Sequence, residues 1–340
     1  MSSRKILLLA ASVAFACLHP VLAETLDITA APLGINSTRV PNASIVTADV
    51  ATVTGGQYAT SDDGTTSFLD ITGGTWSTWN PAGVSSVLTL GGIDDASALA
   101  LGPAAIRLTG NATRLVSCKA AANCGTIRIE LANGASWLNT NTLQIAGQQY
   151  RKGRATVVLN DATLTSMGGG IDLGKYESDV NCGCCSLYAT NSTISTMGSA
   201  AMSWAHGNIA MGDYIFSGST VSFGEGSDYA LSVGTGANLL LCDGTDYAGR
   251  MRIGGKKPCS LTVDDATAKI VRFNIGTDNA TSTAAVHLVK GTLVCADYVC
   301  ACVSAQPAWM DLQDGDCRPG RSTEARIRMR RTRPEAGLRD

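Results

Sequence analysis

The sequence predicts an all-β protein, a single right-handed parallel β-helix (β-solenoid) of about nine coils with irregular caps. A short phrase recurs through the middle of the chain, and apolar residues within each phrase alternate with polar ones. The helical spacing of apolar residues is hard to find in the same segment. Composition agrees, because 37 glycines and only 5% aromatic residues suit a narrow core better than a wide one.

The first residues have the pattern of a secretory signal peptide. Two basic residues precede the apolar run 6–16, and a small-x-small cleavage site occupies 21–23. We therefore expect 1–23 to be removed and the mature protein to be extracellular or at the cell surface. An alternative site ending at Cys17 would make a lipoprotein. No apolar run of spanning length follows, so we expect no transmembrane segment in the mature chain.

The composition also changes near the two ends of the repeat, and this divides the chain. We expect an N-terminal cap over 24–50 and the parallel β-helix over 51–302. A cysteine-containing cap over 303–317 and an Arg-rich disordered tail over 318–340 would follow, because the tail lacks aromatic residues and apolar periodicity. A net charge of −2 gives no global electrostatic reason to expect a nucleic-acid partner.

Each recurring phrase has an extended lead-in, a turn-forming residue, one or two small residues and an apolar residue. Stacked coils would pair each strand with its equivalents above and below, about 4.8 Å away. A weaker copy at Gly236 divides the longest interval, and Gly110 is an uneven midpoint of the first one. The turn-forming residues recur about every 27 residues and are Gly74, Gly134, Asp161, Asn191, Gly218, Asp265 and Gly291.

The cysteines predict an oxidising compartment. The chain has 12 cysteines, and an exported chain with so many is expected to contain disulfides and, after loss of Cys17, at least one thiol without an intramolecular partner. The loop between Cys118 and Cys124 favours that pair. The segment 182–185 ("CGCC") has zinc-ligand spacing, but a second knuckle is missing, so disulfides are preferred over a metal site.

The phrase series in 55–302 resembles the repetitive β-helical segments of bacterial autotransporter passengers, within the wider pectin-lyase-like group. This resemblance implies the architecture and a surface location. An autotransporter would also carry a C-terminal membrane barrel, whereas this chain ends "RRTRPEAGLRD", which puts self-translocation by that route in doubt. The group includes polysaccharide lyases and galacturonan hydrolases, and a chain with either activity would be expected to carry the corresponding motifs.

The hydrolase motifs are incomplete. An "AHG" triplet contains His206 and "RIGGKK" begins at Arg252, but no Asn-Thr-Asp exists and no acidic pair lies shortly before His206. We interpret Asp264-Asp265 as the turn of its phrase and His287 as a solvent-facing strand residue. The other acidic pairs are Asp62-Asp63 and Asp94-Asp95.

A lyase would need carboxylates that bind calcium beside a basic residue. Asp172, Glu177 and Asp179 with Lys175 could supply these groups, but they occur in a polar loop where charged residues are expected anyway. We assign no catalytic, cofactor-binding or metal residue.

Other surface features have simpler readings. Hydroxyl rows at 163–165, 193–195 and 220–222 could form a short ice-binding array, but β-propensity also explains them. Four tryptophans could form a sugar-stacking surface, although Trp76 and Trp137 occupy the apolar slot of their phrases. The Asn-x-Ser/Thr triplets would be glycosylation candidates in a eukaryote and turns otherwise, and they start at Asn36, Asn42, Asn111, Asn191 and Asn279.

These observations lead us to expect an exported, non-enzymatic, adhesin-like surface protein that contacts a cell-surface glycan or a matrix component. The alternative is a lyase or glycoside hydrolase acting on acidic glycans, and ice binding is a minor alternative. Neither the ligand nor the oligomeric state follows from the sequence.

Overall fold

The fold is known from a computed structural model. It describes the chain continuously within 104–117, 119–148, 150–167, 170–176, 178–197, 207–223, 231–275 and 283–301. Outside these ranges it describes the strands in 44–91 and in 308–331. Side chains are described between Ala105 and Cys295 within the continuous ranges, except those of Lys119 and Ala121.

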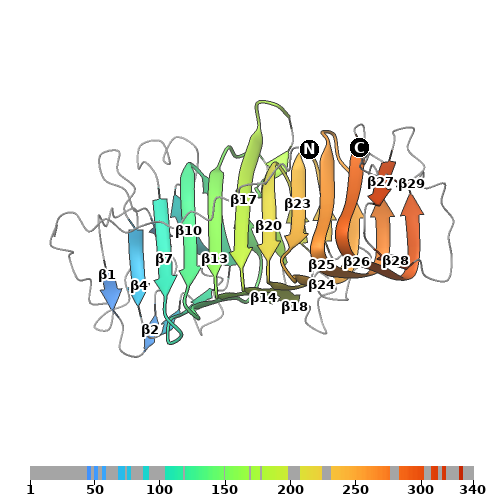
Figure 1. The fold of residues 1–340 in the computed structure, drawn as a ribbon. Coiled ribbons are helices and arrows are strands. Elements are labelled where there is room, and N and C mark those ends of the chain that lie inside the picture. The colour runs from blue at the N-terminus through green and yellow to red at the C-terminus, as the bar shows by residue number, and fades with distance from the viewer. Residues whose placement is uncertain are drawn as a thin grey trace, which may run out of the picture.

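The strands wind into a β-solenoid with three parallel sheets, and successive coils lie side by side in one row (Figure 1). The predicted fold class is therefore confirmed. We number the sheets 1, 2 and 3 in the order in which each coil visits them. Corner 1 joins sheet 1 to sheet 2, corner 2 joins sheet 2 to sheet 3, and corner 3 leads on to sheet 1 of the next coil.

Sheet 1 contains the longest strands and continues into the first parts of β25 (Cys259–Ile275) and β26 (Ala284–Ala301). Its other strands are β1 (Ser44–Val46), β4 (Phe68–Thr72), β7 (Ala104–Thr109), β10 (Thr126–Ala132), β13 (Arg154–Asn160), β17 (Cys182–Thr190), β20 (Gly212–Ser217), β23 (Ala237–Cys242), β27 (Ala308–Leu312) and β29 (Met329–Arg331).

Sheets 2 and 3 share β24 (Asp246–Ile253) and the later parts of β25 and β26. Sheet 2 otherwise consists of β2 (Val50–Thr52), β5 (Thr75–Ser77), β8 (Arg114–Ser117), β11 (Ser136–Asn139), β14 (Thr163–Met167), β18 (Thr193–Met197), β21 (Thr220–Phe223) and β28 (Asp316–Arg318). Sheet 3 otherwise consists of β3 (Gly56–Tyr58), β6 (Val87–Gly91), β9 (Lys119–Cys124), β12 (Leu143–Ile145), β15 (Ile171–Leu173), β19 (Gly207–Ile209) and β22 (Leu231–Val233).

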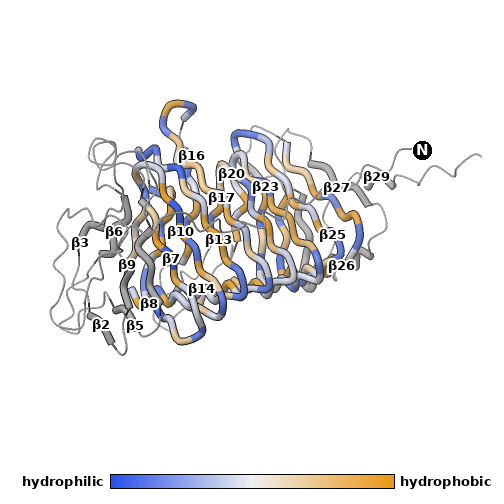
Figure 2. Tube along the Cα trace, turned by 60° about the vertical axis from the view of Figure 1, so that its left-hand side comes forward, coloured by the Kyte–Doolittle hydropathy of each residue, from blue (hydrophilic) through white to orange (hydrophobic). Residues whose placement is uncertain are grey.

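The core is the interior of the coils, and alternation along each strand fills it. In β13, for example, Ala155, Val157 and Leu159 are buried while their neighbours face outward. Figure 2 shows the result, with hydrophobic stretches along the strands and hydrophilic residues at many of the turns between them. Trp137 is 1% exposed, which confirms that it fills the core. Trp76, Trp79 and Trp204 lie outside the described side chains.

The turn-forming residues predicted from the phrases lie at corner 1, apart from Gly74, which is outside the described residues. Asp161, Asn191 and Asp265 have φ of 52°, 48° and 54°, a region where Asn, Asp and Gly are favoured. One assignment was wrong: Gly236 lies at corner 3, between β22 and β23. Asp243, with φ of 53°, occupies corner 1 of that coil. Both corners use left-handed residues, so the phrase alone does not distinguish them.

A ladder of hydroxyl groups explains why small residues follow the turn at corner 1. The hydroxyl oxygen of Ser192 accepts a hydrogen bond from the backbone N–H of Ala162 at 3.2 Å. Ser219 accepts in the same way from Ser192, and Thr245 from Ser219, at 3.1 and 3.2 Å. Each hydroxyl therefore satisfies a buried amide of the preceding coil, where water has no access.

Corner 2 has a shorter buried polar ladder. Ser117 donates to Asn139 Oδ1 at 2.9 Å and accepts from Trp137 Nε1 at 2.8 Å. Asn139 in turn donates to the hydroxyl of Ser166 at 3.3 Å. All four side chains are almost fully buried, so this ladder fixes how three successive coils stack.

The coil count differs slightly from the prediction. The part of the chain described in detail comprises about six turns, whereas about nine were expected for 51–302. That larger count came from dividing a longer segment by the mean interval. In the part described in detail, equivalent residues in neighbouring coils are separated by between 20 and 36 positions, so dividing a length by the mean interval miscounts the coils.

One hairpin leaves the regular path at corner 3. The short strand β16 (Lys175–Tyr176) pairs antiparallel with the start of β17, and the loop between them projects from the solenoid (Figure 2). Lys257, in the loop before β25, holds this hairpin: its ammonium lies 2.6 Å from Asp179 Oδ1 and 5.0 Å from the centre of the Tyr176 ring. The hairpin is thus tied to a later coil.

Candidate functional site

The carboxylates that a lyase would require do not share partners. Asp172 faces outward from sheet 3 and accepts a hydrogen bond from Asn208 Nδ2 at 2.6 Å. Asp179 lies in the hairpin, where the Lys257 hydrogen bond and charge and the Tyr176 hydroxyl hold the pKa of this exposed carboxyl below its usual range. Glu177 and His206 lie outside the described residues. The two described carboxylates, Asp172 and Asp179, therefore have separate partners.

Asp265 and His287 have the structural roles expected from the sequence, whereas the pairs Asp62-Asp63 and Asp94-Asp95 lie outside the described residues. Asp265 is an exposed corner residue whose carboxylate lies 2.9 Å from Lys290 Nζ, which agrees with its interpretation as a turn. His287 lies on sheet 1 in the outward-facing register of β26, beside Thr262 of the preceding strand.

The cysteines divide into outward and inward sets. Cys182 and Cys184 are half-buried on β17, while Cys185 is buried in the core. Burial raises the pKa of the Cys184 thiol, and the neighbouring Cys182 raises it further. Cys118 lies outside the described residues, and no pair among the described cysteines is at disulfide distance, so the expected disulfides remain a prediction.

The hydroxyl rows of sheet 2 are in register over three coils, as expected. Thr163 pairs with Thr193 and Thr193 with Thr220, and the Thr165 and Ser195 hydroxyl oxygens are 3.1 Å apart. Ser195 is only 7% exposed, however, so the second row is not an open flat array.

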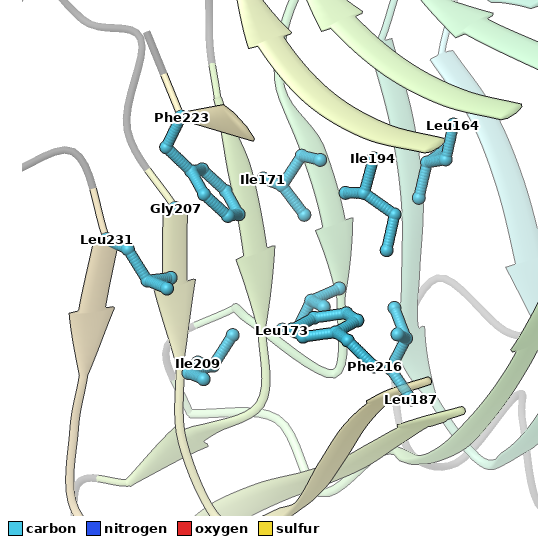
Figure 3. Close-up of a pocket in the computed structure, with 10 residues that line it drawn as sticks. All are labelled: Leu164, Ile171, Leu173, Leu187, Ile194, Gly207, Ile209, Phe216, Phe223 and Leu231. Carbon is cyan, nitrogen blue, oxygen red and sulfur yellow. The ribbon is translucent and has the colours of Figure 1, made fainter. Parts of the chain in front are cut away.

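The interior contains a small void of about 10 Å³ between neighbouring coils. The side chains around it, among them Leu173, Ile194 and Phe223, are entirely apolar (Figure 3). A space of this size holds at most one water molecule, and it offers that molecule no polar side chain. We therefore read it as a packing defect and not as a ligand site.

The outer face of sheet 1 carries a regular arrangement of polar side chains. One outward column runs through Thr156, Ser186, Asp213, Asn238 and Ser260. Asn238 donates to Asp213 Oδ1 at 3.0 Å and accepts from the Ser260 hydroxyl at 3.1 Å. The column thus presents carboxylate, amide and hydroxyl groups at successive coil spacings.

An apolar column runs beside the polar one on the same face. Val158, Tyr188, Ile215 and Leu240 are in register on β13, β17, β20 and β23. Tyr188 is 38% exposed, and the other three are half-buried by their neighbours. We call these two columns together the sheet 1 platform.

An ion cluster ends the platform toward the N-terminal coils. Glu130 accepts from Arg107 Nε at 2.9 Å and from Arg128 Nε at 2.5 Å. Partial burial raises the pKa of Glu130, but the hydrogen bonds and charges of the two arginines together outweigh it and leave the pKa below its usual value. This glutamate is therefore held ionised and oriented by its neighbours.

The sequence did not reveal this platform. Its members are separated by whole coils, and the available signal was an apolar residue at an outward position of a strand, such as Tyr188 or Leu240. Recognising such a position requires the register of the coil, which the phrases give only approximately.

The described ranges contain no group of three or more His, Cys, Asp or Glu side chains arranged to hold a metal ion. They also contain no helix with the length and hydrophobicity that crossing a bilayer requires. No protein-family model, no curated protein and no solved structure matches this chain.

Proposed function

We propose that the chain is an exported, non-enzymatic attachment protein and that the sheet 1 platform binds a linear glycan. The observation that carries this proposal is the pairing of an apolar column with a hydrogen-bonding column in the same register. Sugar rings have apolar faces and hydroxyl-bearing edges, so they can cover Tyr188 and its apolar neighbours while they exchange hydrogen bonds with Asp213 and Asn238.

The direction of the platform favours an extended polymer. Equivalent groups repeat at each coil, about 4.8 Å apart, so a chain lying along the solenoid axis meets the same pair of surfaces repeatedly. Several weak contacts of this kind add up through effective concentration when one polymer spans them. A single small sugar would gain only one such contact.

The direct test is binding to immobilised polysaccharides, with both neutral and acidic polymers on the panel. The variants Tyr188→Ala and Asn238→Ala should each weaken binding by about tenfold, the loss typical of an interface anchor. Thr193→Ala on sheet 2 is the matched control and should bind like the unmodified protein. Equal binding by all three variants would reject the platform as the attachment face.

The competing function, a lyase or hydrolase of acidic glycans, has its own readout. The mature protein is incubated with pectate, alginate and glycosaminoglycans while unsaturated uronate absorbance and new reducing ends are followed. We expect no product. Turnover that disappears in Asp172→Asn would overturn the attachment proposal and establish an enzyme.

A further inference from the structure

A separate concentration of positive charge lies at corner 3, outside the platform. Three loops supply it: the one before β13, the β16–β17 hairpin and the one before β25. We call this surface the basic corner, and its members are Arg151, Lys152, Arg154, Lys175, Lys256 and Lys257. The whole chain has a net charge of −2, so this is a local separation of charge.

Strand pairing brings the first two loops together. Arg154 is in register with Cys184, whose backbone N–H donates to Gly153 O at 2.9 Å. Lys175 is in register with Gly183 on the antiparallel side of the hairpin. Arg154 and Lys175 therefore flank the same few residues of β17, and both are exposed.

The third loop joins them through Lys257. Its ammonium binds Asp179 at 2.6 Å and lies over the Tyr176 ring, so the loop before β25 meets the hairpin directly. Both Arg154 and Lys257 act to lower the pKa of the Cys184 thiol, which agrees with both cations lying near it. Basic side chains thus lie at corner 3 in the coils of β13, β17 and β25, whereas the loops before β20 and β23 contain none.

The acidic side chains described at this corner already have partners. Asp179 is held by Lys257 and by the Tyr176 hydroxyl at 3.3 Å. Asp213 accepts from Asn238 Nδ2 at 3.0 Å. Glu177, whose placement is not described, adds one negative charge to the hairpin sequence. The basic residues still outnumber the acidic ones, so the corner has an excess of positive charge.

We propose that the basic corner binds an anionic polysaccharide that carries carboxylate or sulfate groups. The charges lie along one edge of the solenoid, in the first, second and fifth of five successive coils about 4.8 Å apart, and this spread suits a linear polyanion. Membrane binding would need a contiguous apolar tip. Among the described side chains of these loops, the strongly exposed apolar ones are Tyr150 at 67% and Val180 at 73%, each set among charged residues.

This surface goes beyond the platform proposal, and either can fail alone. The experiment uses the mature full chain and measures binding to immobilised heparin and polygalacturonate, with dextran as the uncharged polymer. The triple variant Arg154→Gln, Lys175→Gln, Lys256→Gln leaves the Lys257 brace intact. The control triple, Arg114→Gln, Lys269→Gln, Lys290→Gln, removes the same charge from other faces. Circular dichroism checks that both variants remain folded.

We expect the corner variant to bind the acidic polymers at least about tenfold more weakly, the control to bind normally, and added salt to weaken binding by the unmodified protein. Equal losses in the two triples would show attraction by net charge alone and would overturn the proposal. The proposal would also be overturned if the protein bound neither heparin nor polygalacturonate. Binding to phosphatidylserine vesicles or to single-stranded DNA that is tighter than binding to these two polymers would overturn it as well. Tyr188→Ala tests the platform separately. Its effect on binding to uncharged polymers such as dextran does not depend on whether the basic corner binds acidic ones.

Discussion

The hydroxyl oxygen of Ser219 accepts the backbone N–H of Ser192, which lies 27 residues earlier in the chain and one coil away, at 3.1 Å. Both side chains are buried, so the amide has no access to water. The same relationship joins Ala162 to Ser192 and Ser219 to Thr245. The ladder at corner 1 is therefore a set of side-chain to backbone bonds between coils.

Replacing Ser219 with alanine should lower the free energy of unfolding by about 1–3 kcal/mol, because the Ser192 amide loses its buried acceptor. The smaller side chain itself fits, since Ala135 and Ala162 occupy equivalent positions in other coils. Denaturant unfolding measures the change. The exposed neighbour Thr220→Ala is the control and should change stability by less than about 0.5 kcal/mol; similar values for the two variants would contradict the role of the ladder.

Substitutions at Gly174 and Gly244 should separate the cost of backbone strain from the cost of steric overlap, because both glycines have a left-handed backbone. Gly174 and Gly244 have φ of +70° and +84°. A Cβ on Gly244 meets nothing, whereas one on Gly174 would overlap the carbonyl oxygen of Ala210 in the next coil. Gly244→Ala should cost about 1–2 kcal/mol for the left-handed backbone alone. Gly174→Ala should cost about 1–3 kcal/mol more, and equal thermal midpoints for the two would refute the close approach.

Thiol accessibility should divide the cysteines of the described strands. Cys182 and Cys184 are half-buried at the base of the hairpin, whereas Cys242 and Cys259 are buried. Burial raises the pKa of Cys259 to about 11, and burial together with Asp243 raises that of Cys242 to about 12. Brief alkylation of reduced native protein should label the first pair about tenfold faster or more. Peptide mass mapping measures this, and equal labelling without denaturant would mean that the coils open readily.

Acid should remove the contribution of Glu130 to stability. Its pKa is lowered in the folded protein because the arginine contacts outweigh partial burial. A lowered folded-state pKa stabilises the protein above the unfolded-state value, and the effect is lost as pH falls through the folded-state value. Glu130→Gln should therefore be less stable than the unmodified protein at neutral pH and nearly equal to it well below about pH 4.3. A constant difference across the pH range, measured by denaturant unfolding, would contradict this.

The fold was predictable because its local requirements are strict. A left-handed corner favours Gly, Asn or Asp, and a buried amide at corner 1 favours a small hydroxyl-bearing neighbour, so Asp161, Asn191 and Ser192 are visible as a phrase. Alternation then marks the strands between corners. Gly236 was misassigned because corner 3 makes the same backbone demand as corner 1.

The surfaces were less predictable because they depend on coil length. Asp213 and Asn238 touch although 25 residues separate them, and this separation changes from one coil to the next. The hairpin adds a second difficulty. Asp179 was identified as a polar loop residue, but its bond to Lys257 depends on the direction in which the hairpin leans across later coils. A short motif encodes neither the length of each coil nor the direction of the hairpin.

The parallel pairing of coil upon coil also sets how the molecule responds to force. Backbone hydrogen bonds between coils run along the stacking axis, so a pull applied between the two ends of the stack loads the bonds of the terminal coil first. Unfolding under such a pull should proceed from the ends of the stack, one coil at a time. Each released residue adds about 3.3–3.6 Å of extended chain. The solenoid therefore lengthens under tension while the coils that have not yet unfolded stay intact.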